Sequence, residues 1–232
     1  MPPGRSAHRP ARRSEDALGG TLTDEGGRTA REALDLLDWK RRVFALYAEI
    51  RTAADPRAAW DRWRVVRREL IATHPQSPIR DAGERAVFEG PWYFDHDPAA
   101  RVTAEVEEAE PQRVVVEGSA DGRFEMTRVG TARFELHGEP GALGLYWVEG
   151  YGGGLFLSFR DATSGADTYG AGRYLLDTVK GVDLGLEEGR LVLDFNLAYQ
   201  PSCSYDPAWA CPLAPPENRL PVPVRAGERL GP

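Results

Sequence analysis

Two carboxylates in the last third of the chain, those of Asp194 and Glu217, have the chemistry of a general acid or base. Two guanidinium groups, those of Arg173 and Arg219, could stabilise the negative charge that such a reaction develops. An enzyme built from these groups requires their side chains to converge within hydrogen-bond reach of one open space. The sequence alone does not show that they converge, so catalysis is one of three functional hypotheses.

Glu217, Asn218 and Arg219 are adjacent on a backbone that Pro216 and Pro221 constrain. Three neighbouring hydrogen-bonding side chains can hold a polar ligand, and a guanidinium forms a two-pronged contact with a carboxylate or phosphate. The same side chains can instead tie the loop to the rest of the protein, which is the alternative we favour. Their partners would then be Asp161, Arg173 or Asp194.

Cys203 and Cys211 are the two cysteines of the chain, and seven residues separate them. Loops can bring them close enough to pair or to respond to an oxidant, but two ordinary, partly buried thiols are the simpler interpretation. The cysteines lack the tight spacing of zinc-binding pairs, and the four histidines lie at no ligand spacing from one another. We expect no metal and no cofactor, although a site of both thiols with His74 stays open.

The segment from Asp194 to Glu228 holds both cysteines and seven prolines, so it can form neither a helix nor a central strand. Tyr199, Tyr205 and Trp209 lie among the prolines, whereas disordered low-complexity segments lack such aromatics. We therefore predict an ordered, irregular strap that packs on a β-structure.

From about Arg101 the apolar residues recur with a period of two, which is typical of β-strands. Turn sequences such as Asp121-Gly122 separate the strands. A consecutive antiparallel meander of about eight strands must close into a barrel or split into a sandwich to hide its edges. After the first strand the others are expected at Val114–Glu117, Phe124–Val129, Ala132–Leu136, Leu143–Val148, Leu155–Phe159, Gly172–Asp177 and Leu191–Tyr199.

Before residue 90 the apolar period is helical, from Leu36 to Ile50 and again from Trp60 to Leu70. Asp55-Pro56 between the two stretches starts the second helix. Two amphipathic helices joined by a short turn form a helical hairpin, whose apolar stripe is expected to pack on the core. We predict an α+β protein with three parts: a disordered tail at 1–28, the helical hairpin and a connector at 29–90, and an antiparallel β domain with the Pro-rich strap at 91–232.

The formal net charge of -7 argues against general nucleic-acid binding, which needs a basic surface. No stretch approaches the ~18 uninterrupted apolar residues of a membrane span, and the N-terminal arginines precede no apolar signal-peptide core. We expect a cytoplasmic protein that contacts neither nucleic acid nor membrane. Its oligomeric state is not readable from the sequence.

Two polar stretches precede the strap. Asp161 opens a turn, where a side-chain bond to the backbone is its default role. The stretch from Thr168 to Tyr174 contains glycines that permit close approach of the backbone, but no βαβ unit surrounds them, which excludes a dinucleotide fingerprint.

The combination of these polar stretches with the strap resembles the signature of domain-of-unknown-function family 1684, a bacterial family of uncharacterised proteins. The resemblance runs from about Leu36 to Glu228 and rests on Asp161-Ala-Thr-Ser-Gly165, Thr168-Tyr-Gly-Ala-Gly-Arg-Tyr174, Asp194-Phe-Asn196, Pro201-Ser-Cys203, Tyr205, Cys211-Pro-Leu213 and Pro216-Glu-Asn-Arg-Leu220. It implies no activity. The shared positions that it marks are Asp161, Tyr169, Gly172, Arg173, Tyr174, Asp194, Asn196, Cys203, Tyr205, Cys211, Glu217, Asn218 and Arg219.

A small-ligand-binding β-protein is the function that asks least of these residues, with a polar or anionic molecule in a pocket flanked by the strap. The enzyme described above is one alternative. The other is an interaction or thiol redox-responsive protein, in which the helical hairpin docks a partner and Cys203 and Cys211 respond to oxidant. The residues expected to bind the small molecule are Asp161, Tyr169, Arg173, Asn196, Tyr205, Asn218 and Arg219.

Overall fold

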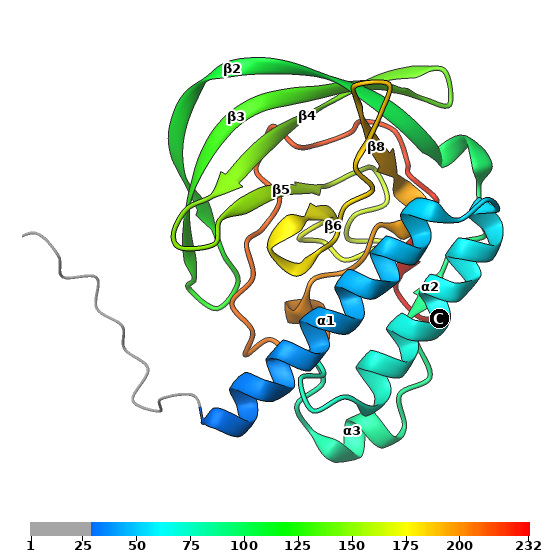
Figure 1. Ribbon diagram of the computed structural model, residues 1–232, viewed down its shortest axis with the longest axis vertical. Coiled ribbons are helices and arrows are strands. Elements are labelled where there is room, and N and C mark those ends of the chain that lie inside the picture. The colour runs from blue at the N-terminus through cyan, green and yellow to red at the C-terminus, as the bar shows by residue number, and fades with distance from the viewer. Residues whose placement is uncertain (1–28) are drawn as a thin grey trace, which may run out of the picture.

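The computed structural model describes residues 29–232, in which three helices precede a β-rich region (Figure 1). Helix α1 spans Ala30–Thr52, α2 spans Pro56–Thr73 and the short α3 spans Ala82–Ala86. The disordered tail predicted for residues 1–28 lies outside the described residues. No helix in the described part of the chain is long and apolar enough to cross a membrane.

Side-chain caps mark the starts of both helices of the hairpin, and α2 begins at the Asp55-Pro56 that the sequence predicts. Thr29 accepts a hydrogen bond from the backbone N–H of Glu32 at 3.2 Å, and the Glu32 carboxylate accepts one from the Thr29 N–H at 2.7 Å. This reciprocal capping box supplies acceptors for N–H groups at the start of α1 that have no intrahelical partner. Asp55 caps α2 through the N–H of Arg57, ahead of which Pro56 takes the first helical position.

Seven antiparallel strands form one sheet, in the order β6-β5-β4-β3-β2-β8-β7, and a two-stranded sheet pairs β1 with β9. The α+β prediction is therefore confirmed. The strands are β1 (Trp92–Tyr93), β2 (Arg101–Glu117), β3 (Arg123–Leu136), β4 (Glu139–Val148), β5 (Gly154–Phe159), β6 (Arg173–Asp177), β7 (Leu186–Glu187), β8 (Arg190–Asp194) and β9 (Glu228–Arg229).

The strand order differs from the consecutive meander that we expected. Strands β2 to β6 follow one another, but β8 returns to the far side of β2, where Ala104 pairs with Leu191. One curved sheet results, rather than a sandwich, and the described strands do not make a closed barrel. An isolated bridge joins Tyr174 of β6 to Tyr199, with backbone N···O distances of 2.8 and 3.0 Å, so the chain after β8 lies against the opposite edge strand.

Two expected boundaries between strands do not exist. The first two predicted strands form the single β2, whose register with β3 shifts between Glu108 and Gln112. Pro111 lies inside this shift, and its lack of an N–H fits an irregularity better than a regular ladder. The segments predicted at Phe124–Val129 and Ala132–Leu136 likewise form the continuous β3, with a register shift against β4.

The last predicted strand, Leu191–Tyr199, is longer than the strand that forms. Strand β8 ends at Asp194, and a 3-10 turn at Phe195–Leu197 follows. The Asp194 carboxylate causes this change, because its Oδ1 accepts the Asn196 N–H at 2.9 Å and so caps the turn.

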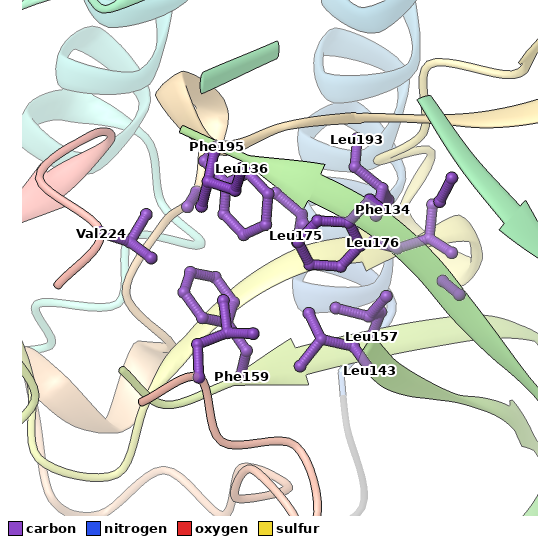
Figure 2. Packing of buried hydrophobic residues seen from close by; sticks show 14 of the residues in the cluster. Phe134, Leu136, Leu143, Leu157, Phe159, Leu175, Leu176, Leu193, Phe195 and Val224 are labelled. Carbon is purple, nitrogen blue, oxygen red and sulfur yellow. The ribbon is translucent and has the colours of Figure 1, made fainter. Parts of the chain in front are cut away.

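The strap, residues 198–228, packs across the concave side of the sheet and closes its core. Leu220, Val224 and Ala226 are buried in the same cluster as Phe134, Phe159 and Phe195. The Phe159 and Phe195 rings meet edge to face at a centroid distance of 5.2 Å. Figure 2 shows Val224 beside these rings, and Figure 1 shows the strap, in orange to red, beneath the arching β2–β4. The prediction of an ordered, irregular strap on a β-structure agrees with this packing.

The helical hairpin packs on a second apolar cluster. Tyr47 of α1 and Trp63 of α2 are buried there with Phe156 of β5 and Tyr174 of β6. Alternate residues of a strand face opposite sides, and β5 follows this rule: Phe156 faces the helices, while Leu157 belongs to the cluster under the strap. The sheet therefore separates two cores, and the helices and the strap cover different ones.

Candidate functional site

Arg173, the first residue of β6, has its guanidinium fully buried under the strap, with 1% of the residue exposed. Its Nη2 donates to Asp161 Oδ2 at 2.7 Å and to the Val224 carbonyl at 2.9 Å. Its Nη1 donates to the carbonyls of Ala226 and Glu228, the second at 3.1 Å. Burial lowers the pKa of Arg173 from its ordinary value, and the Asp161 carboxylate opposes that shift. Arg173 and Asp161, which were expected to bind a ligand, thus bond to each other and to the protein's own backbone.

The other carboxylate oxygen of Asp161 bonds mainly within its own turn and also accepts the Val224 N–H of the strap at 3.4 Å. Its Oδ1 accepts the backbone N–H of Thr163 at 2.6 Å and the Thr163 hydroxyl at 2.5 Å. These are the backbone-turn bonds that its sequence position predicts. Neither Asp161 nor Arg173 lines either of the two cavities described below.

Asp194 and Asn196 form a second buried polar unit, which ties the end of β8 to the connector before β2. Asn196 donates from Nδ2 to Asp194 Oδ1 and to the Asp97 carbonyl, both at 2.8 Å. Its Oδ1 accepts the Asp97 N–H at 2.8 Å. Burial raises the pKa of Asp194 above its ordinary value near 3.8. We expected both residues within a strand at Leu191–Tyr199, but both instead shape the turn that ends β8.

The side chains of the three adjacent residues make different contacts: Glu217, Asn218 and Arg219 do not act as one unit. Asn218 is fully buried, accepts the Gly144 N–H at 2.7 Å and donates to the Gly144 carbonyl at 3.0 Å, as a neighbouring strand would. Glu217 is exposed and accepts a hydrogen bond from the Tyr146 hydroxyl. The Arg219 side chain is exposed and has no hydrogen-bond or ion-pair partner within residues 29–232.

The four groups of the catalytic hypothesis therefore do not surround one space. Glu217 lines a cavity of about 450 Å³ next to β2, together with Tyr146 and Arg160. Asp194, Arg173 and Arg219 line neither that cavity nor the one described next.

A cavity of about 380 Å³ lies between the helical hairpin and the strap; we expected a pocket beside the strap, but not that the helices would form its other wall. Its wall is mainly apolar and aromatic. The expected site residues that reach it are Tyr205 and Cys211. The residues that give its wall its character are Trp39, Val43 and Tyr47 of α1, Trp63 of α2, Tyr174 of β6, and Tyr199, Trp209 and Pro212 of the strap and its approach.

Several polar atoms at this wall have no partner in the described structure. The Tyr199 hydroxyl and the Gln200 Oε1 are buried without a hydrogen bond, in residues that are 9% and 6% exposed. Lys40 of α1 is half-buried, and its ammonium contacts no carboxylate among residues 29–232.

A buried ion pair forms one end of the cavity. Arg67 of α2 donates to both carboxylate oxygens of Glu228, from Nε and, at 3.0 Å, from Nη2. The same carboxylate accepts the Gln200 N–H at 2.6 Å and the Tyr205 hydroxyl at 3.4 Å. Burial opposes the charge of Arg67, but the Glu228 carboxylate raises the pKa of Arg67 above its ordinary range.

The two thiols lie at the other end. Cys203 and Cys211 are free, buried and hydrogen-bonded to each other. The Tyr169 hydroxyl donates to Cys203 Sγ at 3.6 Å. His74 bonds instead to Asp38, at 3.1 Å. Within the described residues no three His, Cys, Asp or Glu side chains form a group that could hold a metal ion.

Sequence reasoning missed this cavity because its wall reads as ordinary core. The apolar stripes of α1 and α2 predict packing, and packing does not say where a gap is left. One signal was present: Lys40 and Lys180 are the two lysines in a chain of 29 basic residues, and both line this cavity.

Comparisons with known proteins identify relatives but no activity. The family described as "Protein of unknown function (DUF1684)" matches residues 86–229, and so begins after the helical hairpin rather than near Leu36. The solution NMR structure of an uncharacterized protein from Haloarcula marismortui is similar, with 38% identity and a TM-score of 0.56. The match covers 75% of this chain and 94% of that one. No curated protein matches the chain.

Replacing Asp161 tests the structural role of the buried ion pair. Asp161→Asn leaves the Arg173 charge buried without a counterion, and we expect the free energy of unfolding to fall by about 3–5 kcal/mol. The matched control is Asp167→Asn, because Asp167 pairs with Arg225 at 2.6 Å on the surface, where such a pair contributes less than ~1 kcal/mol. Urea unfolding followed by circular dichroism measures both. Equal losses in the two variants would contradict the assignment.

Asp194 makes stability depend on pH. Because its pKa is raised in the folded protein, the folded state keeps the proton to a higher pH than the unfolded chain does. The contribution of Asp194 to stability is therefore largest in acid and is lost as pH rises through the raised pKa.

Asp194→Asn should accordingly melt above the wild type near neutral pH, since an amide oxygen still accepts the bonds from Asn196. The advantage should disappear as pH falls through the raised pKa toward the ordinary value near 3.8. Melting temperatures across this range measure it. A wild type that is more stable than the variant at neutral pH would show that the Asp194 charge is favoured, against this prediction.

Proposed function

The chain belongs to the DUF1684 family of proteins of unknown function, and we propose that it binds a small amphipathic anion in the cavity between the helical hairpin and the strap. One observation carries the proposal. The cavity joins an apolar wall to an ammonium group without a carboxylate partner and to buried polar atoms without hydrogen bonds, all within residues 29–232.

The size and lining of the cavity favour a ligand with an apolar body. Its volume of about 380 Å³ falls in the range of roughly 300–1,000 Å³ found for small-molecule sites. Trp39, Trp63 and Tyr174 present ring surface to it, with aliphatic side chains between them. A hydrocarbon chain or an aromatic ring would lose its contact with water there, which favours binding.

The charged residues of the cavity wall favour a ligand with an anionic group. The charged lining residues are Lys40, Arg67 and Lys180, and no Asp or Glu in the described part of the chain joins them. Glu228 neutralises Arg67, and Asp177 pairs with Lys180 at 2.7 Å. Lys40 alone among the three has no carboxylate partner, so a carboxylate or phosphate of the ligand is its natural counterion.

Tyr199 and Gln200 add polar selectivity. A hydroxyl both donates and accepts, whereas an amide oxygen only accepts. Each buried polar atom without a partner costs ~1–3 kcal/mol, so a ligand group that bonds to it recovers part of that free energy. We therefore expect ligands with a hydroxyl or amide group to bind more tightly than plain hydrocarbons with the same anionic group.

The proposed ligand belongs to the class expected from the sequence, a polar or anionic small molecule. Most of the residues expected to bind it do not line the cavity. Tyr205 is the member of the original ligand-binding set that lines this cavity. Asp161, Arg173, Asn196 and Asn218 bond to the protein's own backbone instead.

The test compares decanoate with decanol, which shares its chain length but carries no charge. Decanoate should raise the melting temperature in proportion to the logarithm of its concentration, and calorimetry should give one site per chain. Lys40→Met keeps the apolar stem of the side chain and removes its charge. We expect it to weaken decanoate binding about tenfold, which corresponds to ~1.4 kcal/mol, and to leave decanol binding nearly unchanged.

Arg41→Met is the matched control, because Arg41 is exposed on the same helix and does not line the cavity. It removes the same charge and should leave decanoate binding unchanged. An equal effect of both substitutions would reduce the binding to general electrostatics. Failure of decanoate and of a set of aromatic carboxylates to bind would refute the proposed function.

A further inference from the structure

The contact between Cys203 and Cys211 is a second chemical site, apart from ligand binding. Both side chains are buried, at 6% and 7% exposure, and their thiols are hydrogen-bonded to each other without a disulfide. Cys203 lies in a 3-10 turn at Ser202–Ser204, and seven residues of the strap loop back to Cys211. Two thiols that already touch need little backbone movement to join.

The β2–β3 turn fixes the loop that carries the pair. Ser119 accepts the Cys211 N–H on its Oγ at 2.9 Å and donates from Oγ to the Trp209 carbonyl at 2.7 Å. The Ser119 N–H also donates to the Cys211 carbonyl at 2.9 Å. Trp209 in turn donates from its indole N–H to the Pro78 carbonyl at 2.8 Å. Cys211 is thus held in place from both sides of the loop.

The two thiols differ in acidity. The hydrogen bond from Cys211 is the main cause that lowers the pKa of Cys203 to about 6, whereas the same contact raises the pKa of Cys211. Burial and the contact with Cys203 raise the pKa of Tyr169 to about 12, so its hydroxyl keeps its proton and can donate it to the sulfur. Tyr174 and Lys180 are the other titratable groups that interact with the pair.

The cavity gives access. Cys211 is part of its wall, so a small molecule that enters the cavity reaches this thiol. Cys203 does not line the cavity; its sulfur interacts with Cys211 and accepts a hydrogen bond from the hydroxyl of the half-buried Tyr169.

We propose that Cys203 and Cys211 form a reversible dithiol–disulfide site that reduces a small hydroperoxide, with Cys203 as the attacking thiol and Cys211 as the resolving thiol. The Cys203 sulfur attacks one oxygen of the peroxide, the O–O bond breaks, and an alcohol or water leaves with a proton. Cys203 is now a sulfenic acid. The Cys211 sulfur attacks the Cys203 sulfur, the S–S bond forms, and water leaves with the Cys211 proton.

The two thiols together give two electrons to the peroxide, and an external dithiol restores them by exchange. Thiolate is the nucleophile in such a reaction, which assigns the first step to Cys203. This site does not depend on the proposed anion, so a protein that binds no decanoate can still show it.

The experiment oxidises the full chain with a small excess of hydrogen peroxide. Free thiols are then counted after denaturation, and the intact mass is measured. The wild type should lose both thiols together with two hydrogens of mass, and dithiothreitol should restore them. Retention of both thiols by the wild type would overturn the proposal without recourse to any variant.

Two serine variants, checked for folding by circular dichroism, assign the roles. In Cys211→Ser the sulfenic acid has no resolving thiol, so Cys203 should be labelled by dimedone. In Cys203→Ser we expect at least tenfold slower labelling at Cys211. Equal or reversed labelling would contradict the assignment of Cys203 as the attacking thiol.

Tyr169→Phe tests the positioning role of the hydroxyl. It removes the donor at 3.6 Å from Cys203 Sγ and should move the pH profile of Cys203 alkylation to higher pH. Tyr151→Phe, at a fully exposed tyrosine, is the control and should leave the profile unchanged. An unchanged profile in Tyr169→Phe would remove this residue from the site.

Discussion

The buried guanidinium of Arg173 is the interaction on which the rest of the structure depends. A charge so far from water needs a counterion and hydrogen-bond acceptors, and within the described residues both terminal nitrogens of Arg173 have them while Nε does not. Asp161 supplies the opposite charge, and the carbonyls of Val224, Ala226 and Glu228 supply three acceptors. These three carbonyls belong to alternate residues, so one side chain fixes the path of the segment from Val224 to Glu228.

Glu228 joins this anchor to the helical hairpin. Its backbone carbonyl accepts from Arg173 beneath the strap, and its side chain forms a buried ion pair with Arg67 of α2. Sheet, strap and helices are therefore connected through one residue with 0% exposure.

The position of the cavity follows from these anchors. The first part of the strap follows the turn after β8, passes between the helices and β6, and returns by way of Cys211. Its prolines prevent regular pairing along this course, and the Tyr174–Tyr199 bridge is the point where it bonds to β6 as a strand would. The irregular backbone leaves a cavity between the aromatic residues of α1 and α2 and those of the sheet. Tyr199 and Gln200 line this space, and within the described residues the Tyr199 hydroxyl and the Gln200 Oε1 have no hydrogen-bond partner.

Local patterns in the sequence predicted the local structure well. Asp55 predicted the start of α2 through capping chemistry, and the period of two predicted the strand region. The order of the strands was not predictable in the same way, because the pairing of β8 with β2 depends on residues almost ninety positions apart, such as Ala104 and Leu191. The end of β8 was missed since an aspartate in a strand and an aspartate that caps a turn look alike in sequence.

The candidate site was harder to predict, for a physical reason. Charged and amide side chains attract attention as chemical groups, yet Asp161, Arg173 and Asn218 are buried and consumed by backbone partners. The cavity, by contrast, is lined by residues such as Trp39 and Trp63 that any amphipathic helix would contribute to a core. Sequence reveals which residues are apolar, and only the three-dimensional packing reveals where they fail to meet.

Hydrogen–deuterium exchange on the wild-type protein tests most directly whether the strap is anchored as firmly as the sheet. The informative amides are those of Gln200, which donates to Glu228 Oε2, and of Glu228, which donates to the Ala198 carbonyl at 2.8 Å. The account predicts that both exchange only on global unfolding, as slowly as amides in the centre of β3. Exchange at these two positions that is orders of magnitude faster than in β3 would show that the strap opens by itself, and would contradict the central role of Arg173.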